Sequence, residues 1–434
     1  MKMPELLAPA GNFEKLRFAL GFGADAVYCG VPFLSMRARE NQFDQNSLRQ
    51  AVKYCRLKKK KIYFTVNIYP HNDKISAFKT VFRKIVRLNP DAFIVSDPGM
   101  IDFIRENFPA VELHLSVQQN TINYLSAAFW KKQGIKRIIL SKELSIDEIK
   151  EIIKQNTKLD FEIFIHGSIC IAHSGRCLLS NFLTHRDANQ GVCAHSCRWR
   201  YKVYEKIGKK RLIDLGEKEY FLEEEKRPGE FLKIDEDENG SFIMSSRDIC
   251  SLEVLNRIIK TGVKSLKIEG RSKTVYYLAI ICRCYRHALD RLKEGRPVNV
   301  KGLFDEVFST CNRGFIPGFF EGDLGEKTIE YHERESSSTH DFAGIVKNFN
   351  KIEDHIEIEP KNRFQKNDQL EFCFPDKRKD FRIKVKEMIL NDEEKVEVAH
   401  GGDKNVFLKI PSRHFNKFKD KEIFCIIRKR KSDL

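Results

Sequence analysis

Phe13-Glu-Lys-Leu-Arg-Phe-Ala-Leu-Gly21-Phe-Gly-Ala-Asp-Ala26-Val-Tyr-Cys29 shows the structural unit that the first 295 residues repeat. Its first nine residues carry the apolar spacing of an amphipathic helix. Glycine then ends the helix, and Ala26–Cys29 reads as a short buried strand. The stretch Gly262-Val-Lys-Ser-Leu-Lys267 resembles the glycine-to-strand part of this unit. The unit is therefore a helix that ends at glycine and leads directly into a parallel strand.

The same alternation of strands and helices runs through the first 295 residues. Strands are predicted at 5–8, 26–29, 62–66, 92–95, 112–115, 137–140, 161–165 and 265–268. Helices are predicted at 13–21, 46–57, 74–88, 100–107, 122–133, 146–154, 249–260 and 274–293. Eight alternations of this kind favour a closed (β/α)8 TIM-type barrel over an open sheet.

One interval breaks this rhythm. About eighty residues separate the seventh strand from its helix, whereas a loop from a strand to the next helix is normally only a few residues long. We therefore predict a barrel over 1–295 with a long insertion at 166–248 at its C-terminal face, where barrel enzymes carry their active sites. Residues 296–340 are interpreted as a connector. Short alternating runs at 341–434 predict a small C-terminal antiparallel β-barrel domain.

The overall composition limits the class of protein. The formal net charge of +16 makes a polyanion such as nucleic acid a plausible partner, although a well-solvated basic surface explains it equally well. The chain shows no signal-peptide pattern and no apolar run long enough to span a bilayer. We therefore expect a soluble, cytoplasmic protein without a membrane partner.

Four of the twelve cysteines lie close together inside the insertion, at Cys170, Cys177, Cys193 and Cys197. Thiolates are soft ligands that bind iron–sulfur clusters or zinc, so these four predict a single metal centre. Zinc sites favour C-x2-C pairs, which are missing here, and the spacing therefore favours a cluster without excluding zinc. The alternative is that the four cysteines are unconnected.

Strand alternation predicts which side chains point into the barrel. In Glu112-Leu-His-Leu-Ser-Val-Gln118 the apolar set, which includes Val117, should face the helices, and His114 and Gln118 should point inward. The predicted substrate-binding residues, by this test and by their place at the barrel mouth, are Asn67, His114, Gln118, Lys267, Glu269 and Arg271. Buried charges need partners, so Lys267 could instead form an internal ion pair. Otherwise the lumen suits a small molecule with carboxylates.

Common hydrolase motifs are missing from the sequence. It contains no G-x-S-x-G elbow, no H-E-x-x-H helix and no Walker A loop.

The segment Glu162-Ile-Phe-Ile-His-Gly-Ser-Ile-Cys-Ile-Ala-His-Ser-Gly-Arg-Cys-Leu-Leu-Ser180 resembles the signature of the collagenase-like peptidase family thirty-two. Further stretches are similar to that family: Glu5-Leu-Leu-Ala-Pro-Ala-Gly11, His114-Leu-Ser-Val-Gln118, Arg186-Asp-Ala-Asn-Gln-Gly191 and Ser265-Leu-Lys-Ile-Glu-Gly-Arg271. The resemblance extends from residue 5 into the C-terminal β domain.

Within this family the sequence is most similar to a branch that modifies tRNA. That resemblance implies a tRNA uridine hydroxylase that forms 5-hydroxyuridine at the wobble position in the anticodon region. It also implies a 4Fe-4S cluster on the four cysteines and prephenate, a small dicarboxylate, as co-substrate. Two alternatives stay open: a peptidase of the same family, and an RNA-binding iron–sulfur protein without enzymatic activity.

Overall fold

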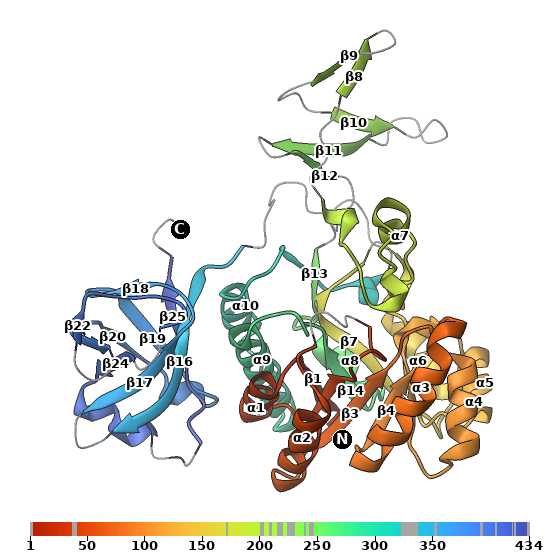
Figure 1. Ribbon diagram of the computed structural model, residues 1–434, viewed down its shortest axis with the longest axis horizontal. Helices are drawn as coiled ribbons and strands as arrows, with labels where there is room; N and C mark the ends of the chain where they lie inside the picture. The colour runs from red at the N-terminus through yellow and green to blue at the C-terminus, as the bar shows by residue number, and fades with distance from the viewer. Residues whose placement is uncertain are drawn as a thin grey trace. The chain divides into compact units, whose positions relative to one another are not determined.

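Figure 1 shows the computed structural model of the chain, in which eight parallel strands close into a barrel. The structure describes residues 3–36, 41–170, 172–199, 247–322, 337–350, 354–390, 394–403, 406–418, 420 and 422–431, together with the backbone of short strands between 204 and 242. The barrel strands are β1 (Glu5–Ala10), β2 (Ala26–Gly30), β3 (Lys61–Val66), β4 (Ala92–Val95), β5 (Leu113–Leu115), β6 (Arg137–Ile139), β7 (Asp160–Ser168) and β14 (Ser265–Ile268). Because β14 pairs with both β1 and β7, the ring is closed and the predicted barrel is confirmed.

Helices separate the strands along the chain, and local sequence explains where they begin. The helices are α1 (Phe13–Gly21), α2 (Gln45–Leu57), α3 (Asn72–Ile85), α4 (Pro98–Asn107), α5 (Tyr124–Lys132), α6 (Ile146–Gln155), α7 (Leu179–Thr184), α8 (Leu255–Ile259), α9 (Val275–Lys293) and α10 (Val300–Phe308). At the start of α6, Ser145 and Glu148 cap each other's backbone N–H groups. Ile146, Ile149 and Ile152 are then buried at helical spacing, so one stripe of α6 turns inward.

The chain forms two compact units. The first contains residues 1–13, 25–272 and 312–336, and therefore all eight barrel strands. The second contains residues 14–24, 273–311 and 337–434, and therefore α9, α10 and the C-terminal strands.

The C-terminal strands form a curled antiparallel sheet, which confirms the predicted β domain. Its order is β20 (Phe381–Lys384), β19 (Gln369–Cys373), β25 (Ile426–Arg430), β16 (His340–Asn350), β17 (His355–Pro360), β24 (Val406–Lys409), β21 (Met388–Leu390) and β22 (Glu394–Val396). Alternate residues of β17 are buried, including Ile356 and Ile358, and they join a core with Phe364 and Phe372. This alternation is what a sheet with one buried face requires.

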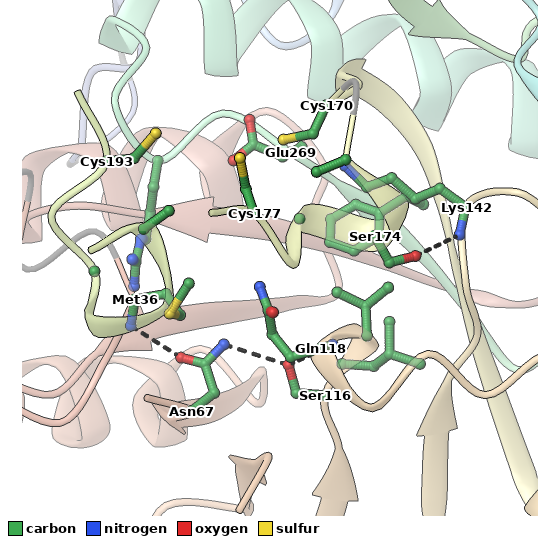
Figure 2. A pocket seen from close by; sticks show the side chains of 18 of the residues that line it. Met36, Asn67, Ser116, Gln118, Lys142, Cys170, Ser174, Cys177, Cys193 and Glu269 are labelled. Carbon is green, nitrogen blue, oxygen red and sulfur yellow. Dashed lines mark hydrogen bonds between the residues drawn. The ribbon is translucent and has the colours of Figure 1, made fainter. Parts of the chain in front are cut away.

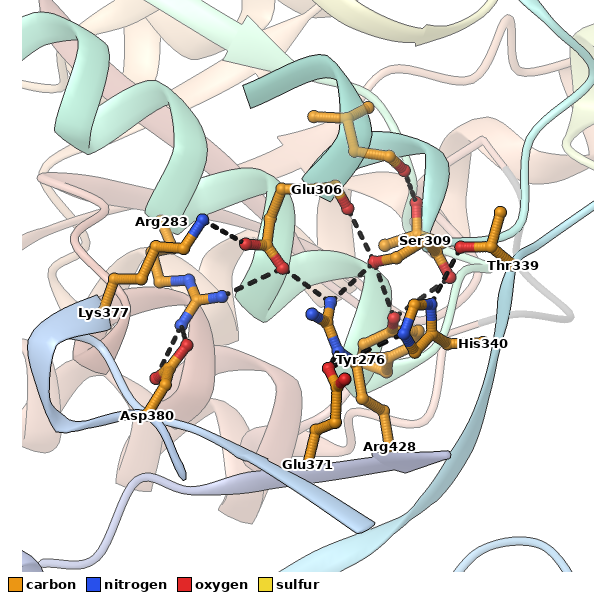
Figure 3. A network of polar contacts seen from close by, with 12 residues as sticks. Tyr276, Arg283, Glu306, Ser309, Thr339, His340, Glu371, Lys377, Asp380 and Arg428 are labelled. Carbon is orange, nitrogen blue, oxygen red and sulfur yellow. Dashed lines mark hydrogen bonds and ion pairs between the residues drawn. The ribbon is translucent and has the colours of Figure 1, made fainter. Parts of the chain in front are cut away.

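Figure 3 shows a network of charged side chains around Glu306 of α10, within the second unit. Its carboxylate lies 2.6 Å from Arg428, 2.8 Å from Lys377 and 3.2 Å from Arg283. Burial raises the pKa of Glu306, but these three cations together lower it to about 2. The carboxylate therefore stays ionised and links both helices, α9 and α10, to the C-terminal sheet.

The insertion leaves and re-enters the barrel at neighbouring positions. Strand β7 runs on to Ser168, and β13 (Asp248–Cys250) returns antiparallel beside it with Asp248 opposite Ser168. The side chain of Arg313 donates to the Ser168 hydroxyl over 3.1 Å and to the Asp248 carboxylate over 2.5 Å. The helix predicted at 249–260 is therefore wrong at its start, because 248–250 pair with β7 and only Leu255–Ile259 is helical.

The structure describes part of the remaining predicted insertion and part of the predicted connector. Between 204 and 242 the backbone forms β8 (Tyr204–Ile207), β9 (Arg211–Asp214), β10 (Tyr220–Glu223), β11 (Phe231–Asp237) and β12 (Gly240–Phe242). The predicted connector contains α10 and the short strand β15 (Phe315–Ile316), which pairs with β13. Its residues 323–336 lie outside the described residues. No helix in the described part of the chain has both the length and the apolar character that crossing a bilayer demands.

Candidate functional site

A cavity of about 330 Å³ opens at the C-terminal ends of the barrel strands. Polar side chains reach it from the ends of several strands: Asn67 after β3, Gln118 after β5, Lys142 after β6, and Arg271 after β14. The first part of the insertion, from Ile169 to Cys197, contributes the facing wall. Figure 2 shows Cys170, Cys177 and Glu269 across the cavity from Asn67 and Ser116.

All four cysteines predicted to bind metal line this one cavity. Cys170 is exposed, while Cys177, Cys193 and Cys197 are half-buried, and none of them is in a disulfide. The backbone N–H of His195 donates to the sulfur of Cys193 over 3.3 Å. The eight other cysteines do not line the cavity. The sequence spacing therefore selected the four thiols that line one cavity in the structure.

The donor chemistry of these thiols suits an iron–sulfur cluster, since four cysteine sulfurs are its usual ligands. Their arrangement is more open than a bound cluster requires. Among the described residues, no three side chains of histidine, cysteine, aspartate or glutamate lie close enough together to hold a metal ion. Binding a cluster therefore has to draw the four sulfurs closer together, and their role as ligands stays a prediction.

A clamp between Glu143 and Ser174 holds the segment that separates Cys170 from Cys177. The two carboxylate oxygens of Glu143 accept from the backbone N–H and the hydroxyl of Ser174, each over 2.5 Å. Ser174 has a φ of 44°, a left-handed conformation that is unfavourable for a residue with a Cβ. The paired hydrogen bonds offset that strain and fix the loop against the turn that follows β6.

Arg186 holds the segment that carries Cys193. Its guanidinium donates to the carbonyl oxygens of Val192 and Cys193, over 3.2 Å and 3.1 Å. The side chain of Asn189 donates to the carbonyl oxygen of Cys177 over 3.1 Å. The two halves of residues 170–197, which we call the cysteine segment, are thus tied together through their backbones.

The cysteine segment also rests on the loop that follows β3. The guanidinium carbon of Arg176 lies 5.1 Å from the centre of the Tyr69 ring, and the side chain of Gln190 donates to the Tyr69 carbonyl. The ammonium of Lys74 donates to the Gln190 side chain over 2.7 Å. These contacts fix the wall of the cavity opposite the strand ends.

Five of the six predicted substrate-binding residues line the cavity: Asn67, Gln118, Lys267, Glu269 and Arg271. The Asn67 amide is already engaged, because it accepts from the backbone N–H of Met36 and donates to the Ser116 hydroxyl. The Gln118 side chain is buried, and its Oε1 has no hydrogen-bond partner among the described residues. Gln118 is therefore the side chain best prepared to bind a ligand in the cavity.

Arg271 is buried at the same end of the barrel, where it donates to the Thr65 hydroxyl over 3.3 Å. The end of β2 leaves room for it. A Cβ on Gly30 would lie 2.6 Å from Nη1 of Arg271, so any larger residue at Gly30 would displace the guanidinium.

Lys267 forms the internal ion pair that the sequence left open. Its ammonium lies 2.7 Å from the carboxylate of Glu162, which also lies 3.3 Å from Arg137. Burial raises the pKa of Glu162, but Lys267 and Arg137 together lower it to about 2. Burial lowers the pKa of Lys267, and the nearby charges of Arg137 and Arg271 lower it too, although Glu162 opposes this. Lys267 therefore reaches the cavity with its charge largely balanced.

His114 is the predicted substrate-binding residue that does not line the cavity. It points inward as expected, but its Nε2 lies 2.9 Å from the Glu112 carboxylate and its ring packs edge-on against Tyr63. Burial and the charge of Arg137 lower the pKa of His114, although Glu112 opposes this. Glu112 directly precedes β5 and His114 is the second residue of that strand, so His114 lies deeper in the barrel than the residues that line the cavity at the mouth.

The side-chain directions predicted from strand alternation were also wrong beyond Leu115. Strand β5 ends there, and a single 3-10 turn, η3 (Val117–Gln119), follows. Val117 therefore turns towards the cavity instead of the helices, next to Gln118.

Lys142, Glu143, Ser174 and Arg186 line the cavity but were not predicted. A signal existed for the first two, because they directly follow the sixth predicted strand and barrel enzymes place functional groups after strand ends. Ser174 could not be found in this way, because it depends on contacts within an irregular loop.

The contacts of Ser174 do not resemble a serine protease site. Its hydroxyl is hydrogen-bonded to the carboxylate of Glu143, and the nearest ring nitrogen of His173 lies 3.9 Å from that same carboxylate. A catalytic triad instead places the imidazole between the serine and the carboxylate.

Comparison with known proteins gives two family matches. Residues 11–330 match the model of peptidase family U32, and residues 338–419 match the model of the peptidase family U32 C-terminal domain. The tRNA hydroxylation protein P of Haemophilus influenzae is 38% identical, across 94% of this chain and 93% of its own length. The protein of the same name in Escherichia coli is 38% identical across 95% and 94%. A protein of Porphyromonas gingivalis named Collagenase is 32% identical across 75% and 76%.

Proposed function

The chain belongs to peptidase family U32, and on that premise we propose that it is an enzyme of tRNA hydroxylation in the cytoplasm. The observation that carries the proposal is the 38% identity, over nearly the whole of both chains, to relatives named tRNA hydroxylation protein P. The net charge of +16 supports a polyanionic substrate.

The finer proposal is that the reaction converts the wobble uridine of the anticodon to 5-hydroxyuridine. An unpaired base can leave the anticodon loop and enter a pocket, where hydrogen bonds to its edge identify it. The Gln118 amide suits the uracil edge: Oε1 can accept from the ring N–H and Nε2 can donate to a ring carbonyl. A cavity of about 330 Å³ has room for the base together with a small second molecule.

Prephenate is the second molecule in this proposal. It carries two carboxylates, and the cavity presents Arg271, Lys142, Arg186 and Lys267 against two acids, Glu143 and Glu269. Arginine binds carboxylates through two parallel N–H groups, so buried Arg271 is the residue we assign to one of them.

A 4Fe-4S cluster is also part of the proposal, with Cys170, Cys177, Cys193 and Cys197 as its ligands. Such a cluster supplies one-electron chemistry when it is bound. The protein's own part is to hold the cysteine segment in place. Arg186 fixes the backbone at Cys193, and Glu143 fixes Ser174 between the first two cysteines.

The peptidase alternative is weaker. It is supported by the relative named Collagenase, which is less similar and covers less of this chain. Ser174 does not form a serine triad with the described residues around it, because its hydroxyl donates directly to Glu143. An RNA-binding protein without enzymatic activity is the other alternative, and it predicts tRNA binding with no change in nucleosides.

Mass spectrometry of tRNA nucleosides tests the proposal. A strain lacking this gene should lose 5-hydroxyuridine and nucleosides derived from it, and the wild-type gene should restore them. Cys193→Ala should fail to restore them, whereas Cys311→Ala, which changes an exposed cysteine that does not line the cavity, should succeed. Unchanged nucleosides in the deletion strain, with no second pathway active, contradict the proposal. Peptide cleavage by the purified protein that Glu143→Ala abolishes would favour the peptidase instead.

A further inference from the structure

Exposed apolar side chains gather on α7 and on the residues just after the cysteine segment. Leu178 is 75% exposed, Phe182 81%, Leu183 42% and Trp199 41%. We call these four residues the α7 patch. Single exposed apolar residues are ordinary on a protein surface, but two aromatic rings and two leucines within 22 residues suggest a contact surface.

The outward direction of Phe182 is set by the opposite face of α7. There, the buried Ser180 donates to the carbonyl oxygen of Arg186 over 2.6 Å and accepts from the backbone N–H of Ala194 over 2.9 Å. Leu178 and Phe182 are four residues apart and share a helix face, whereas Ser180 lies on the other side. Anchoring Ser180 therefore turns the Phe182 ring towards solvent.

Trp199 is attached to the same support. Its indole N–H donates to the carbonyl oxygen of Ala194 over 3.1 Å, so one edge of the indole is fixed while the ring stays partly exposed. Ala194 thus anchors both α7, through Ser180, and Trp199. Two aromatic faces are held on one short piece of backbone before any partner binds, which lowers the entropy cost of binding.

The α7 patch continues the wall of the cavity. Cys177 and Arg186 flank α7 in the sequence and both line the cavity, as does Cys193 beside Ala194. Residues 172–197 contain two arginines, at 176 and 186, and a single acidic residue, Asp187. A surface that combines exposed aromatic rings with an excess of arginine suits single-stranded nucleic acid, whose bases stack on the rings while its phosphates attract the cations.

We propose that the α7 patch binds the unpaired bases of the RNA loop that flank the base in the cavity, by stacking them on Phe182 and Trp199. This inference rests on the proposed function, because it takes tRNA as the substrate. It assigns the α7 patch to RNA and not to a protein or a second copy of this chain, because a purely apolar partner would gain nothing from the arginines.

The test compares the affinities of two RNA probes by fluorescence anisotropy. One is an anticodon stem-loop with an unpaired loop, and the other is a fully paired duplex of similar length. Phe182→Ala and Trp199→Ala should each weaken binding of the stem-loop roughly 5- to 150-fold and leave duplex binding unchanged, because only unpaired bases stack. Phe182→Trp, which keeps an aromatic face, should bind the stem-loop like the wild type.

Phe129→Ala is the matched control. Phe129 lies on α5 and is 52% exposed, so its removal changes a comparable exposed ring away from the cavity. It should change neither affinity. Equal stem-loop affinities for wild type, Phe182→Ala and Trp199→Ala overturn the inference. A lower unfolding temperature of both alanine variants at unchanged RNA affinity would also overturn it, because the α7 patch would then be a packing surface. Dissociation of a dimer of this chain by either substitution, at unchanged RNA affinity, would overturn it too, because the α7 patch would then be an interface between two copies.

Failure of this inference is distinguishable from failure of the proposed function. If the wild type hydroxylates tRNA and both alanine variants bind the stem-loop normally, only the α7 patch assignment is lost. If the wild-type protein neither binds nor modifies tRNA, both proposals are lost.

Discussion

The ammonium of Lys267 lies 2.7 Å from the carboxylate of Glu162, and both side chains are buried inside the barrel. Arg137 shares the same carboxylate and also contacts Glu5 over 2.8 Å. The barrel interior below the cavity is therefore a connected set of charges, and Lys267 at its top is compensated before any ligand arrives. Arg271 also lies buried at the cavity, and it is the residue that we assign to a carboxylate of the ligand.

Glu162→Gln should change how stability depends on pH. The folded-state pKa of Glu162, about 2, lies below that of an unfolded glutamate, so its charge stabilises the fold above about pH 5 and this contribution is lost as the pH falls towards 2. The full contribution is about 3 kcal/mol. Urea unfolding should show a less stable variant at neutral pH whose stability falls less on acidification. Glu151→Gln, an exposed glutamate on α6, should behave like the wild type. Parallel acid profiles for Glu162→Gln and the wild type would contradict the assignment.

Removing one cavity cysteine should remove the cluster. Protein purified without oxygen should be coloured and contain about four iron atoms per chain. Cys193→Ala should lose most of the iron and the visible absorbance, because a ligand is missing, while Cys311→Ala should keep both. A colourless, iron-free wild type prepared without oxygen would show that the four thiols do not hold a cluster.

Gln118→Leu should impair recognition of the base without preventing tRNA binding. Leucine has a similar volume but no polar atoms, so two hydrogen bonds to uracil are lost at about 1 kcal/mol each. We expect roughly a thirtyfold lower rate of hydroxylation at subsaturating tRNA, with tRNA affinity nearly unchanged because phosphate contacts dominate it. The control is Gln133→Leu, an exposed glutamine after α5. Normal hydroxylation by Gln118→Leu would exclude the proposed base contact.

Arg271→Lys should weaken the use of prephenate. Lysine keeps the positive charge but loses the two parallel N–H groups that fit a carboxylate. The prephenate concentration that gives half-maximal hydroxylation should rise roughly tenfold, and the maximal rate should change less. Arg257→Lys, an exposed arginine paired with Glu321, is the matched control. An unchanged concentration dependence for Arg271→Lys would place the carboxylate elsewhere.

The sequence predicted the barrel well, because each buried parallel strand is a short apolar run bounded by turn residues. Ala92–Val95 and Ser265–Ile268 were predicted with the bounds that the structure has. Inward-pointing residues within strands, such as Lys267, followed from alternation. Four cysteines in one loop were enough to predict that they share a site, and they do share a cavity.

The errors occurred where a distant partner decides the structure. Residues 248–250 are a strand because β7 lies beside them, and that partner is about eighty residues earlier in the chain. Val117 faces the cavity because a 3-10 turn interrupts the alternation. Ser174 owes its conformation to Glu143, thirty-one residues away, and no local pattern contains that information.

The side chain of Arg313 donates hydrogen bonds to Ser168 and Asp248, the residues at which the insertion leaves and re-enters the barrel. Because Ser168 and Asp248 already lie side by side, the barrel does not fix the length of the segment between them. Doubling its length would cost only about 0.6 kcal/mol of closure entropy. This segment can therefore vary in length while the barrel keeps its eight strands, provided that its first part keeps the hydrogen bonds to Glu143 and Tyr69.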